Sequence, residues 1–235
     1  MSLLLGSGKE KPQILSTSVS FSGIEFEVVK NGESNNRYIW LHGDERTANM
    51  ALRHHLNHYD GTAFLIKSDE REVVYQNTKI DPNRIFSRSG SLRALKKFRP
   101  KWAPGTLNEA LDELDQNREQ FLTILFPDSG GILIAVHNNF RGYNLKSELE
   151  ICTKVSVNPK ENPRDFIICT DPDDFDKLSV GHYNILLQDQ PPKEDDGSLS
   201  WAAFRNGIRY VNIETRLGWL SQQKKMLEFI EERLN

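Results

Sequence analysis

Apolar and polar residues alternate along the chain with two periods, one typical of strands and one typical of helices. Short apolar or alternating runs of strand length occupy 23–30, 38–41, 63–66, 72–75, 131–136, 165–169, 184–187 and 210–213. Segments with helical spacing or helix-start signals occupy 46–58, 91–98, 107–121 and 222–234. Because strands and helices alternate, the pattern predicts an α/β fold: a single domain with a mixed, mostly parallel sheet and helices on both faces.

Two local signals add detail to this pattern. Thr106 can cap the helix at 107–121, with Glu109 as the reciprocal capping residue. The segment 188–200 is polar and acidic and contains two consecutive prolines, so we expect a mobile loop there.

The length of 235 residues suits one domain with a sizeable core. We expect residues 1–22 to form an N-terminal extension, part of which could stem from cloning, and 23–235 to form the folded domain. Met1–Ser7 lacks the basic n-region and the full apolar h-region of a signal peptide. The compartment stays open: the cytoplasm is slightly favoured, and export would require that the N-terminus had been trimmed.

Charge and cysteine content narrow the class of protein. The formal net charge is −3 and the pI is near 6.1, so nothing indicates binding to nucleic acid or to an anionic membrane. No segment approaches the ~20 apolar residues of a membrane-spanning helix. Cys152 and Cys169 both lie in strand-like runs, which favours two buried free thiols over a disulfide.

Two imidazoles and a carboxylate occur where strands of the predicted sheet end. His42 and Glu45 lie in the turn between the strand at 38–41 and the helix at 46–58, and His137 directly follows the strand at 131–136. Two His and one Glu form a recurring ligand set of catalytic zinc, which keeps one position open for water. Open α/β sheets bind ligands at the C-terminal ends of their strands. The spacing therefore predicts a zinc site on these three residues.

Two further motifs could supply substrate binding and catalysis. In Asp81-Pro82-Asn83-Arg84, the arginine can hold a carboxylate by a bidentate contact, which a lysine could not. Taken alone, this segment is typical of a turn with a solvated arginine. Glu214 follows the apolar run at 210–213, and an unpaired carboxylate in a buried run is costly, which favours a role as general base.

These motifs and their order resemble the zinc carboxypeptidase superfamily, which includes metallocarboxypeptidases and the aspartoacylase-like and succinylglutamate desuccinylase-like deacylases. His42-x-x-Glu45 matches the family's first ligand pair, and His137 matches its third ligand, which also follows an apolar strand. Glu214 matches the catalytic glutamate at the end of a late strand.

The segment Asp81-Pro82-Asn83-Arg84-Ile85-Phe86 resembles the family's Asp-x-Asn-Arg-x-Phe/Trp segment, in which Asn and Arg bind a substrate carboxylate. The resemblance runs from roughly Ile24 to the C-terminus. It implies that 23–235 is a zinc-hydrolase catalytic domain.

The chain also departs from the family pattern. A further arginine usually precedes the Asn-Arg pair and polarises the scissile carbonyl. Arg71 is the nearest upstream candidate but has a different spacing, and Arg141, just after His137, is the candidate that we place among the substrate-binding residues.

Carboxypeptidases proper carry a mobile tyrosine upstream of the glutamate. Tyr183 and Tyr210 are available for this role, but neither lies in a recognisable motif. The aspartate usual before the third ligand is absent, since Ala135 and Val136 precede His137.

Two other clusters could in principle bind metal. His54 and His58 are at i, i+4 on the predicted helix, with His55 beside them, but no glutamate lies between them, so a solvated helix face is favoured. The acidic segment 171–176 lacks the glycine and ligand spacing of a calcium loop, so an Asp-rich helix N-terminus is favoured.

The combined prediction is a zinc-dependent hydrolase that cleaves an amide bond in a carboxylate-bearing substrate, of carboxypeptidase or peptide amidase type. Glu214 would move the proton, zinc and an arginine would stabilise the oxyanion, and Asn83 with Arg84 would hold the carboxylate.

Two alternatives stay open. One is a deacylase of a small N-acyl amino acid, and the other is a non-catalytic binding module that keeps the fold. The expected partner is a peptide or N-acyl amino acid with a free carboxylate, without nucleic acid or membrane. The natural substrate and oligomeric state are not indicated by the sequence.

Overall fold

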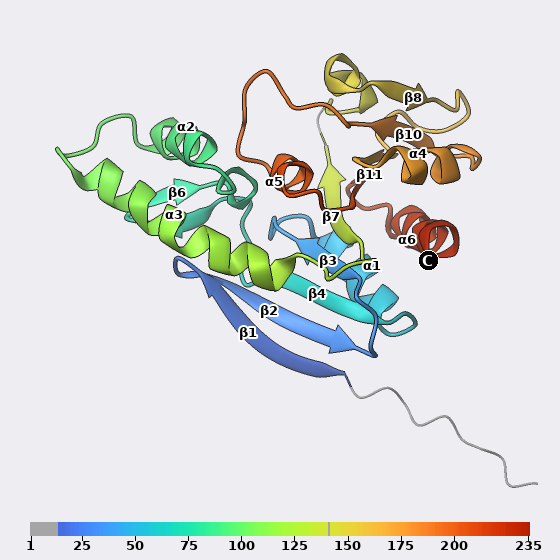
Figure 1. Ribbon diagram of the computed structural model, residues 1–235, viewed down its shortest axis with the longest axis horizontal. Coiled ribbons are helices and arrows are strands. Elements are labelled where there is room, and N and C mark those ends of the chain that lie inside the picture. The colour runs from blue at the N-terminus through green and yellow to red at the C-terminus, as the bar shows by residue number, and fades with distance from the viewer. Residues whose placement is uncertain (1–13, 141) are drawn as a thin grey trace, which may run out of the picture.

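The computed structural model describes residues 14–140 and 142–235, and within them nine strands form one mixed sheet (Figure 1). In spatial order the strands are β1 (Leu15–Phe21), β2 (Ile24–Asn31), β4 (Gly61–Ile66), β3 (Arg37–Trp40), β7 (Leu133–Asn139), β11 (Tyr210–Arg216), β9 (Phe166–Cys169), β10 (Asn184–Leu187) and β8 (Lys154–Ser156). The four central strands β4, β3, β7 and β11 are parallel, and antiparallel pairs flank them. This architecture confirms the predicted α/β fold with a mixed sheet.

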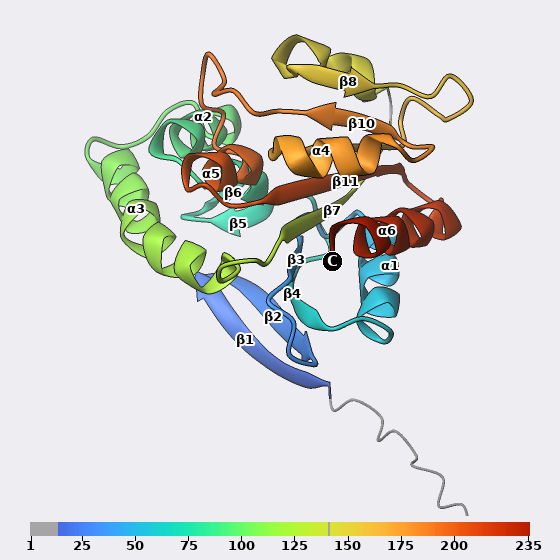
Figure 2. The same cartoon turned by 45° about the vertical axis from the view of Figure 1, so that its right-hand side comes forward.

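Helices cover both faces of the sheet, as Figures 1 and 2 show. One face carries α1 (Arg46–Leu56), α4 (Pro172–Ser179) and α6 (Leu220–Leu234), and the other carries α2 (Arg88–Phe98), α3 (Thr106–Leu125) and α5 (Leu199–Arg205). The chain steps from β3 through α1 to β4, and then steps back through α2 and α3 to β7. Because crossovers between parallel strands are right-handed, these two opposite steps place their helices on opposite faces.

The smaller elements are separate from the nine-stranded sheet. They are the ribbon of β5 (Val73–Tyr75) and β6 (Thr78–Ile80) and the 3-10 turns η1 (Pro82–Arg84), η2 (Leu145–Ser147) and η3 (Leu149–Ile151).

The core follows from the continuous apolar runs of the central strands. Every residue of β4, β7, β9 and β10 is buried, as expected for strands covered on both faces. Phe121 of α3 packs on Phe21 and Phe26, with 5.1 Å between ring centroids in each pair, and so fixes α3 over β1 and β2.

The sheet begins earlier than the boundary expected at residue 23. β1 pairs with β2 along its whole length, with Leu15 opposite Lys30 and Phe21 opposite Ile24. Alternating serines and threonines give β1 little apolar signal, which explains why the sequence pattern did not indicate it. The remaining part of the expected extension, including Met1–Ser7, lies outside the described residues.

Several helix ends differ from expectation. The N-cap of α3 is Gly105, with φ of 83°, and the Thr106 hydroxyl donates to the Ala103 carbonyl, so the expectation that Thr106 caps the helix was wrong. Asp171 caps α4 by accepting from the backbone of the next turn, in agreement with a helix N-terminus at the acidic segment. The expected loop at 188–200 includes the start of α5.

The other clusters singled out in the sequence do not form a second metal site in the described residues. His55 points inward, with its Nε2 2.9 Å from Glu231, whereas His54 and His58 stack on each other at the outer side of α1. Cys152 and Cys169 are free thiols, of which Cys169 is fully buried. No helix in 14–140 or 142–235 is both long and apolar enough to span a membrane.

Candidate metal centre and active-site cavity

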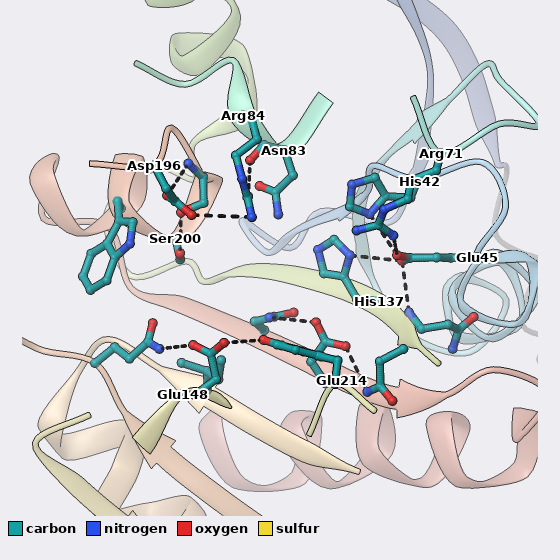
Figure 3. A pocket seen from close by; sticks show the side chains of 18 of the residues that line it. His42, Glu45, Arg71, Asn83, Arg84, His137, Glu148, Asp196, Ser200 and Glu214 are labelled. Carbon is teal, nitrogen blue, oxygen red and sulfur yellow. Dashed lines mark hydrogen bonds and ion pairs between the residues drawn. The ribbon is translucent and has the colours of Figure 1, made fainter. Parts of the chain in front are cut away.

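A cavity of about 410 Å³ opens at the C-terminal ends of β3, β7 and β11 (Figure 3). Six of the residues predicted from the sequence line it, namely His42, Glu45, Asn83, Arg84, His137 and Glu214. Arg141, the seventh, lies outside the described residues. Because the three strands are parallel neighbours, residues far apart in the sequence converge at one edge of the sheet.

The turn from β3 into α1 places His42 and Glu45 on the same side. The Glu45 amide donates to the His42 carbonyl at 3.1 Å, and the Arg46 amide donates to Asp44 at 2.9 Å, so the chain turns tightly. Gly43 lies against the chain near Ser68, and a Cβ at Gly43 would be 2.1 Å from the Ser68 carbonyl oxygen. Only glycine fits at the centre of the His-x-x-Glu motif.

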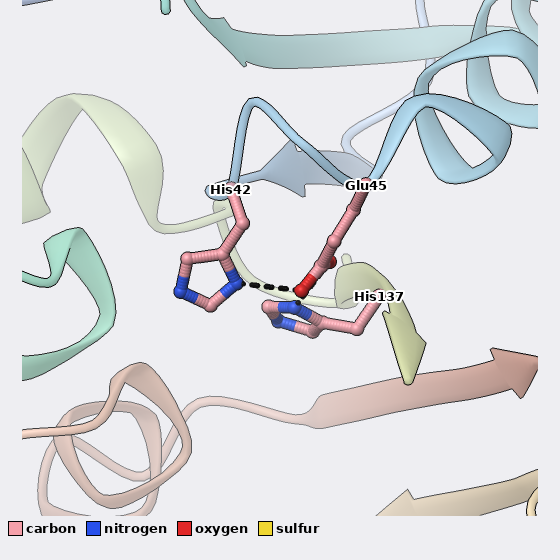
Figure 4. Close-up of side chains that lie close together, drawn as sticks. All are labelled: His42, Glu45 and His137. Carbon is pink, nitrogen blue, oxygen red and sulfur yellow. Dashed lines mark hydrogen bonds and ion pairs between the residues drawn. The ribbon is translucent and has the colours of Figure 1, made fainter. Parts of the chain in front are cut away.

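His42, Glu45 and His137 form a compact donor group, with one ligand atom of each within 4.8 Å of the others (Figure 4). All three are buried. Both imidazoles turn Nδ1 toward Glu45: His42 Nδ1 is 2.9 Å from Oε1 and His137 Nδ1 is 3.0 Å from Oε2. The carboxylate thus lies between the two rings.

Polar groups around the donor group hydrogen-bond to His42 and Glu45 and orient them. The far nitrogen of His42, Nε2, is 2.9 Å from the Asp81 carboxylate. Arg71 donates to Glu45 Oε1 at 2.8 Å, and the Asn138 backbone amide donates to Oε2 at 3.0 Å. Asp81, from the motif thought to hold substrate, therefore orients a candidate ligand.

Charge coupling shifts the pKa values of these groups strongly. Burial acts to lower the pKa of His42, but the carboxylates of Glu45 and Asp81 outweigh it and raise that pKa to about 9. Burial acts to raise the pKa of Glu45, but the imidazoles of His42 and His137 outweigh it and hold that pKa well below its ordinary value. The site therefore favours a negative Glu45, which is the state a cation requires.

The donor group fits a metal ion. Two imidazole nitrogens and a carboxylate oxygen face a common point, and the carboxylate of Asp81 on the far nitrogen of His42 is the usual support for a metal-bound histidine. The other nitrogen of His137, Nε2, is buried and has no hydrogen-bond partner among the described residues. Metal binding would require the coordinating ring nitrogen of each histidine to be unprotonated.

Glu214 lies beside the donor group because of the register of β11 and β7. In this parallel pair Glu214 is opposite His137, so both side chains project from the same face of the sheet. Asn139 donates to Glu214 Oε2 at 3.1 Å. Burial raises the pKa of Glu214, and the charge of Glu45 adds to this shift, whereas His137 and Asn139 oppose it.

Asn83 and Arg84 lie in η1, on the opposite wall from Glu214 (Figure 3). The Asn83 side-chain oxygen accepts from the Leu199 backbone amide at 2.9 Å, which fixes η1 against the start of α5. Arg84 faces the cavity and is 38% exposed, and its NH2 is 3.5 Å from Asp196. A substrate carboxylate would compete with Asp196 for this guanidinium.

Several lining residues were not assigned to the site from the sequence. Arg71 was set aside because of its spacing, yet it reaches the cavity and contacts Glu45. At the end of the cavity away from Arg71, Glu148 accepts from Tyr143 at 2.6 Å and from Gln188 at 2.8 Å (Figure 3). No sequence motif marks these residues, because only the fold brings them to the cavity.

The tyrosines considered in the sequence occupy other places. Tyr183 and Tyr210 are buried in the core and do not line this cavity, whereas Tyr143 does.

No protein-family model and no curated protein matches the chain. Solved structures described as a "putative metallopeptidase" overlap with most of its length. The one from Shewanella baltica OS155 is 13% identical, with 93% of this chain and 86% of that chain covered and a TM-score of 0.48. Those from Shewanella amazonensis SB2B and Shewanella denitrificans OS217 are 13% and 12% identical, cover 94% of this chain and 85% and 82% of theirs, and both have a TM-score of 0.49. These similarities assign no activity to the chain.

Proposed function

We propose that this protein is a zinc-dependent hydrolase that cleaves an amide bond in a substrate carrying a free carboxylate. The observation that carries the proposal is the convergence of His42, Glu45 and His137 with Glu214 at one cavity. A zinc ion on the three donors would supply a water of lowered pKa and would polarise the substrate carbonyl.

Glu214 is the group suited to move the proton. Its carboxylate is buried beside His137, and its raised pKa brings it closer to neutrality, where a general base is most effective. The Asn139 amide fixes one oxygen and leaves lone pairs on both oxygens. Glu214 would take a proton from the attacking water and pass it to the leaving amine.

Arg71 is suited to stabilise the oxyanion, the role considered in the sequence for Arg71 and Arg141. Its guanidinium lies at the donor group and lines the cavity. Burial acts to lower the pKa of Arg71, but the charges of Glu45 and Asp81 outweigh it and raise that pKa, so the side chain stays cationic. A fixed cation at the point where negative charge develops lowers the barrier.

Arg84 is suited to hold the substrate carboxylate. Its contact with Asp196 is long and both side chains are partly exposed, so the pair is weak and a substrate carboxylate could replace Asp196. The side-chain amide of Asn83 is bonded through its oxygen to Leu199, which leaves its NH2 group as the donor.

The deacylase alternative is supported by the size of the cavity. A volume of about 410 Å³ is at the small end of ligand sites, and a small N-acyl amino acid would fill it. A peptide substrate would place only its terminal residue there. The non-catalytic alternative would not require an arginine for an oxyanion, and the position of Arg71 at the donor group supports the hydrolase over that alternative.

A substrate panel with metal exchange tests the proposal. The protein is stripped with a chelator, reloaded with zinc, and assayed on peptides with a free C-terminal carboxylate, their amidated counterparts, and N-acyl amino acids. We expect zinc-dependent hydrolysis of a carboxylate-bearing class. Protein that holds zinc but cleaves no member would favour the binding module, and turnover that survives complete zinc removal would contradict the proposed chemistry.

A further inference from the structure

Asn138 contacts both parts of the chain that carry the candidate ligands: it follows His137 on β7, and it hydrogen-bonds to the segment that begins with His42-x-x-Glu45. Its backbone amide donates to Glu45 at 3.0 Å, and its side-chain oxygen accepts from the Ala48 amide at 2.7 Å. Ala48 is in the first turn of α1, and Glu45, the N-cap residue of that helix, makes no side-chain cap bond itself. Asn138, the residue that follows His137 in the chain, therefore caps α1 from β7 and also contacts the Glu45 carboxylate.

Gln223 of α6 hydrogen-bonds to both Asn138 and His137. Its side-chain NH2 donates to the His137 carbonyl at 2.9 Å, and its oxygen accepts from the Asn138 amide at 2.8 Å. Gln223 is fully buried, and both of its polar atoms are used. Asn138 also donates to the Thr215 carbonyl at 3.3 Å, next to Glu214 on β11.

The alternation of side chains along β7 and β11 explains this arrangement. His137 and Glu214 project toward the cavity, so Asn138 and Thr215 project from the opposite face, where α1 and α6 lie. A buried amide pair on the helix side thus ties the strand ends that carry His137 and Glu214 to the helix that begins after Glu45.

We propose that Asn138 and Gln223 are positioning residues of the metal centre, through which α6 sets the relative placement of His42-x-x-Glu45 and His137. This inference rests on the proposed function, because it concerns the same metal site. A metal site tolerates only about 0.5 Å of misplacement, and removal of an outer partner typically weakens metal affinity about 10–100-fold. A helix remote from the cavity would therefore control affinity for zinc.

The test uses a pair of variants on the same helix. Gln223→Met keeps a flexible side chain of similar length but removes both hydrogen bonds, and Gln223→Glu keeps an acceptor for Asn138 but loses the donor to His137. Glu231→Gln is the matched control, because Glu231 also ties α6 to α1 through His55. Glu231 is eight positions further along α6, about 12 Å away at the rise of a helix.

The readouts are the Kd for zinc, by competition with a chromogenic chelator, and the melting temperature of each zinc-free variant. We expect both Gln223 variants to bind zinc about 10–100-fold more weakly. Glu231→Gln should lower the melting temperature without changing the Kd. Equal zinc affinity in wild type and a folded Gln223 variant would overturn the inference, as would an equal loss in the control.

The results that would overturn the proposed function differ from those that would overturn the role of Asn138 and Gln223. Wild-type protein that binds no zinc would overturn both claims together, whereas wild-type protein that binds zinc tightly and hydrolyses nothing would overturn only the proposed hydrolase. If Gln223→Met does not fold, Gln223→Glu decides the comparison.

Discussion

Glu214 is a buried carboxylate whose described hydrogen bonds come only from neutral amides, of Asn139 and, at 3.5 Å, of Asn212. Such a placement disfavours the charged form, and burial accordingly raises its pKa. Burying this carboxylate costs stability, and that cost is explained if Glu214 must accept a proton during turnover.

We therefore expect Glu214→Gln to keep the shape of the site and to bind zinc almost as well as wild type. Its kcat should fall by a factor on the order of 10²–10⁴, the usual contribution of a general base. Steady-state kinetics with parallel zinc analysis check this. Near-normal turnover would mean that another group activates the water, and a loss of zinc would mean that Glu214 is itself a ligand.

Arg84 and Asp196 allow a matched pair of variants with opposite effects. Arg84→Lys should raise the KM of carboxylate-bearing substrates, because lysine cannot form the bidentate contact. Asp196→Asn should lower that KM, because it removes the internal competitor for the guanidinium. Amidated substrates serve as the control in both cases. A shift of the same size with amidated substrates would show that Arg84 does not recognise the carboxylate.

At the level of elements, α1 and α6 are joined by a buried polar contact at the end away from the metal centre. Glu231 of α6 accepts from the Tyr38 hydroxyl and lies 2.9 Å from His55. Burial acts to raise the pKa of Glu231, but the bonds from His55 and Tyr38 outweigh it and lower that pKa below its ordinary value of 4.5. A lowered pKa in the folded state means that the ionised carboxylate stabilises the fold above about pH 4.5 and that this contribution is lost as the pH falls through the lowered value.

Glu231→Gln should accordingly lower the free energy of unfolding at neutral pH by about 1.5–3 kcal/mol, as for a hydrogen bond to a charged group. The difference in the free energy of unfolding between wild type and variant should become smaller as the pH falls below about 4.5. Urea unfolding at a series of pH values measures it. A gap that stays constant or widens on acidification would show that the Glu231 charge does not stabilise the contact.

The elements that could be predicted from the sequence are those whose signal is local. The central strands were predictable because each contains a short run of mainly apolar residues, and α1, α3 and α6 because of their helical spacing. β1 has mostly exposed serines and threonines, and β8 has three residues, so neither carries a comparable pattern. The acidic N-terminus of α4 was predictable because its capping residue lies within the helix's own sequence.

In the candidate site, too, only the residues with a local sequence signal could be predicted. His42 and Glu45 are joined by one turn, and His137 and Glu214 each end an apolar run, so their chemistry could be inferred from short segments. The roles of Arg71 and Gln223 depend on contacts with residues 26 and 86 positions away in the chain, namely Glu45 and His137. Only the strand order of the sheet creates such contacts, and a single sequence does not specify it.

At the level of the whole molecule, one group of donor atoms, on His42, Glu45 and His137, is the point where the elements converge. The sheet, the turn at Gly43 and the helices α1 and α6 together position these atoms. Every role proposed above requires that this group binds a metal ion. The most direct measurement is elemental analysis of protein prepared without chelator, for wild type and for His137→Ala, combined with X-ray absorption at the zinc edge. We predict about one zinc per wild-type chain, with nitrogen and oxygen ligands at about 2.0–2.2 Å, and little retained zinc in the variant. Wild-type protein that takes up no zinc even when it is supplied, or zinc that is retained fully without His137, would contradict the account.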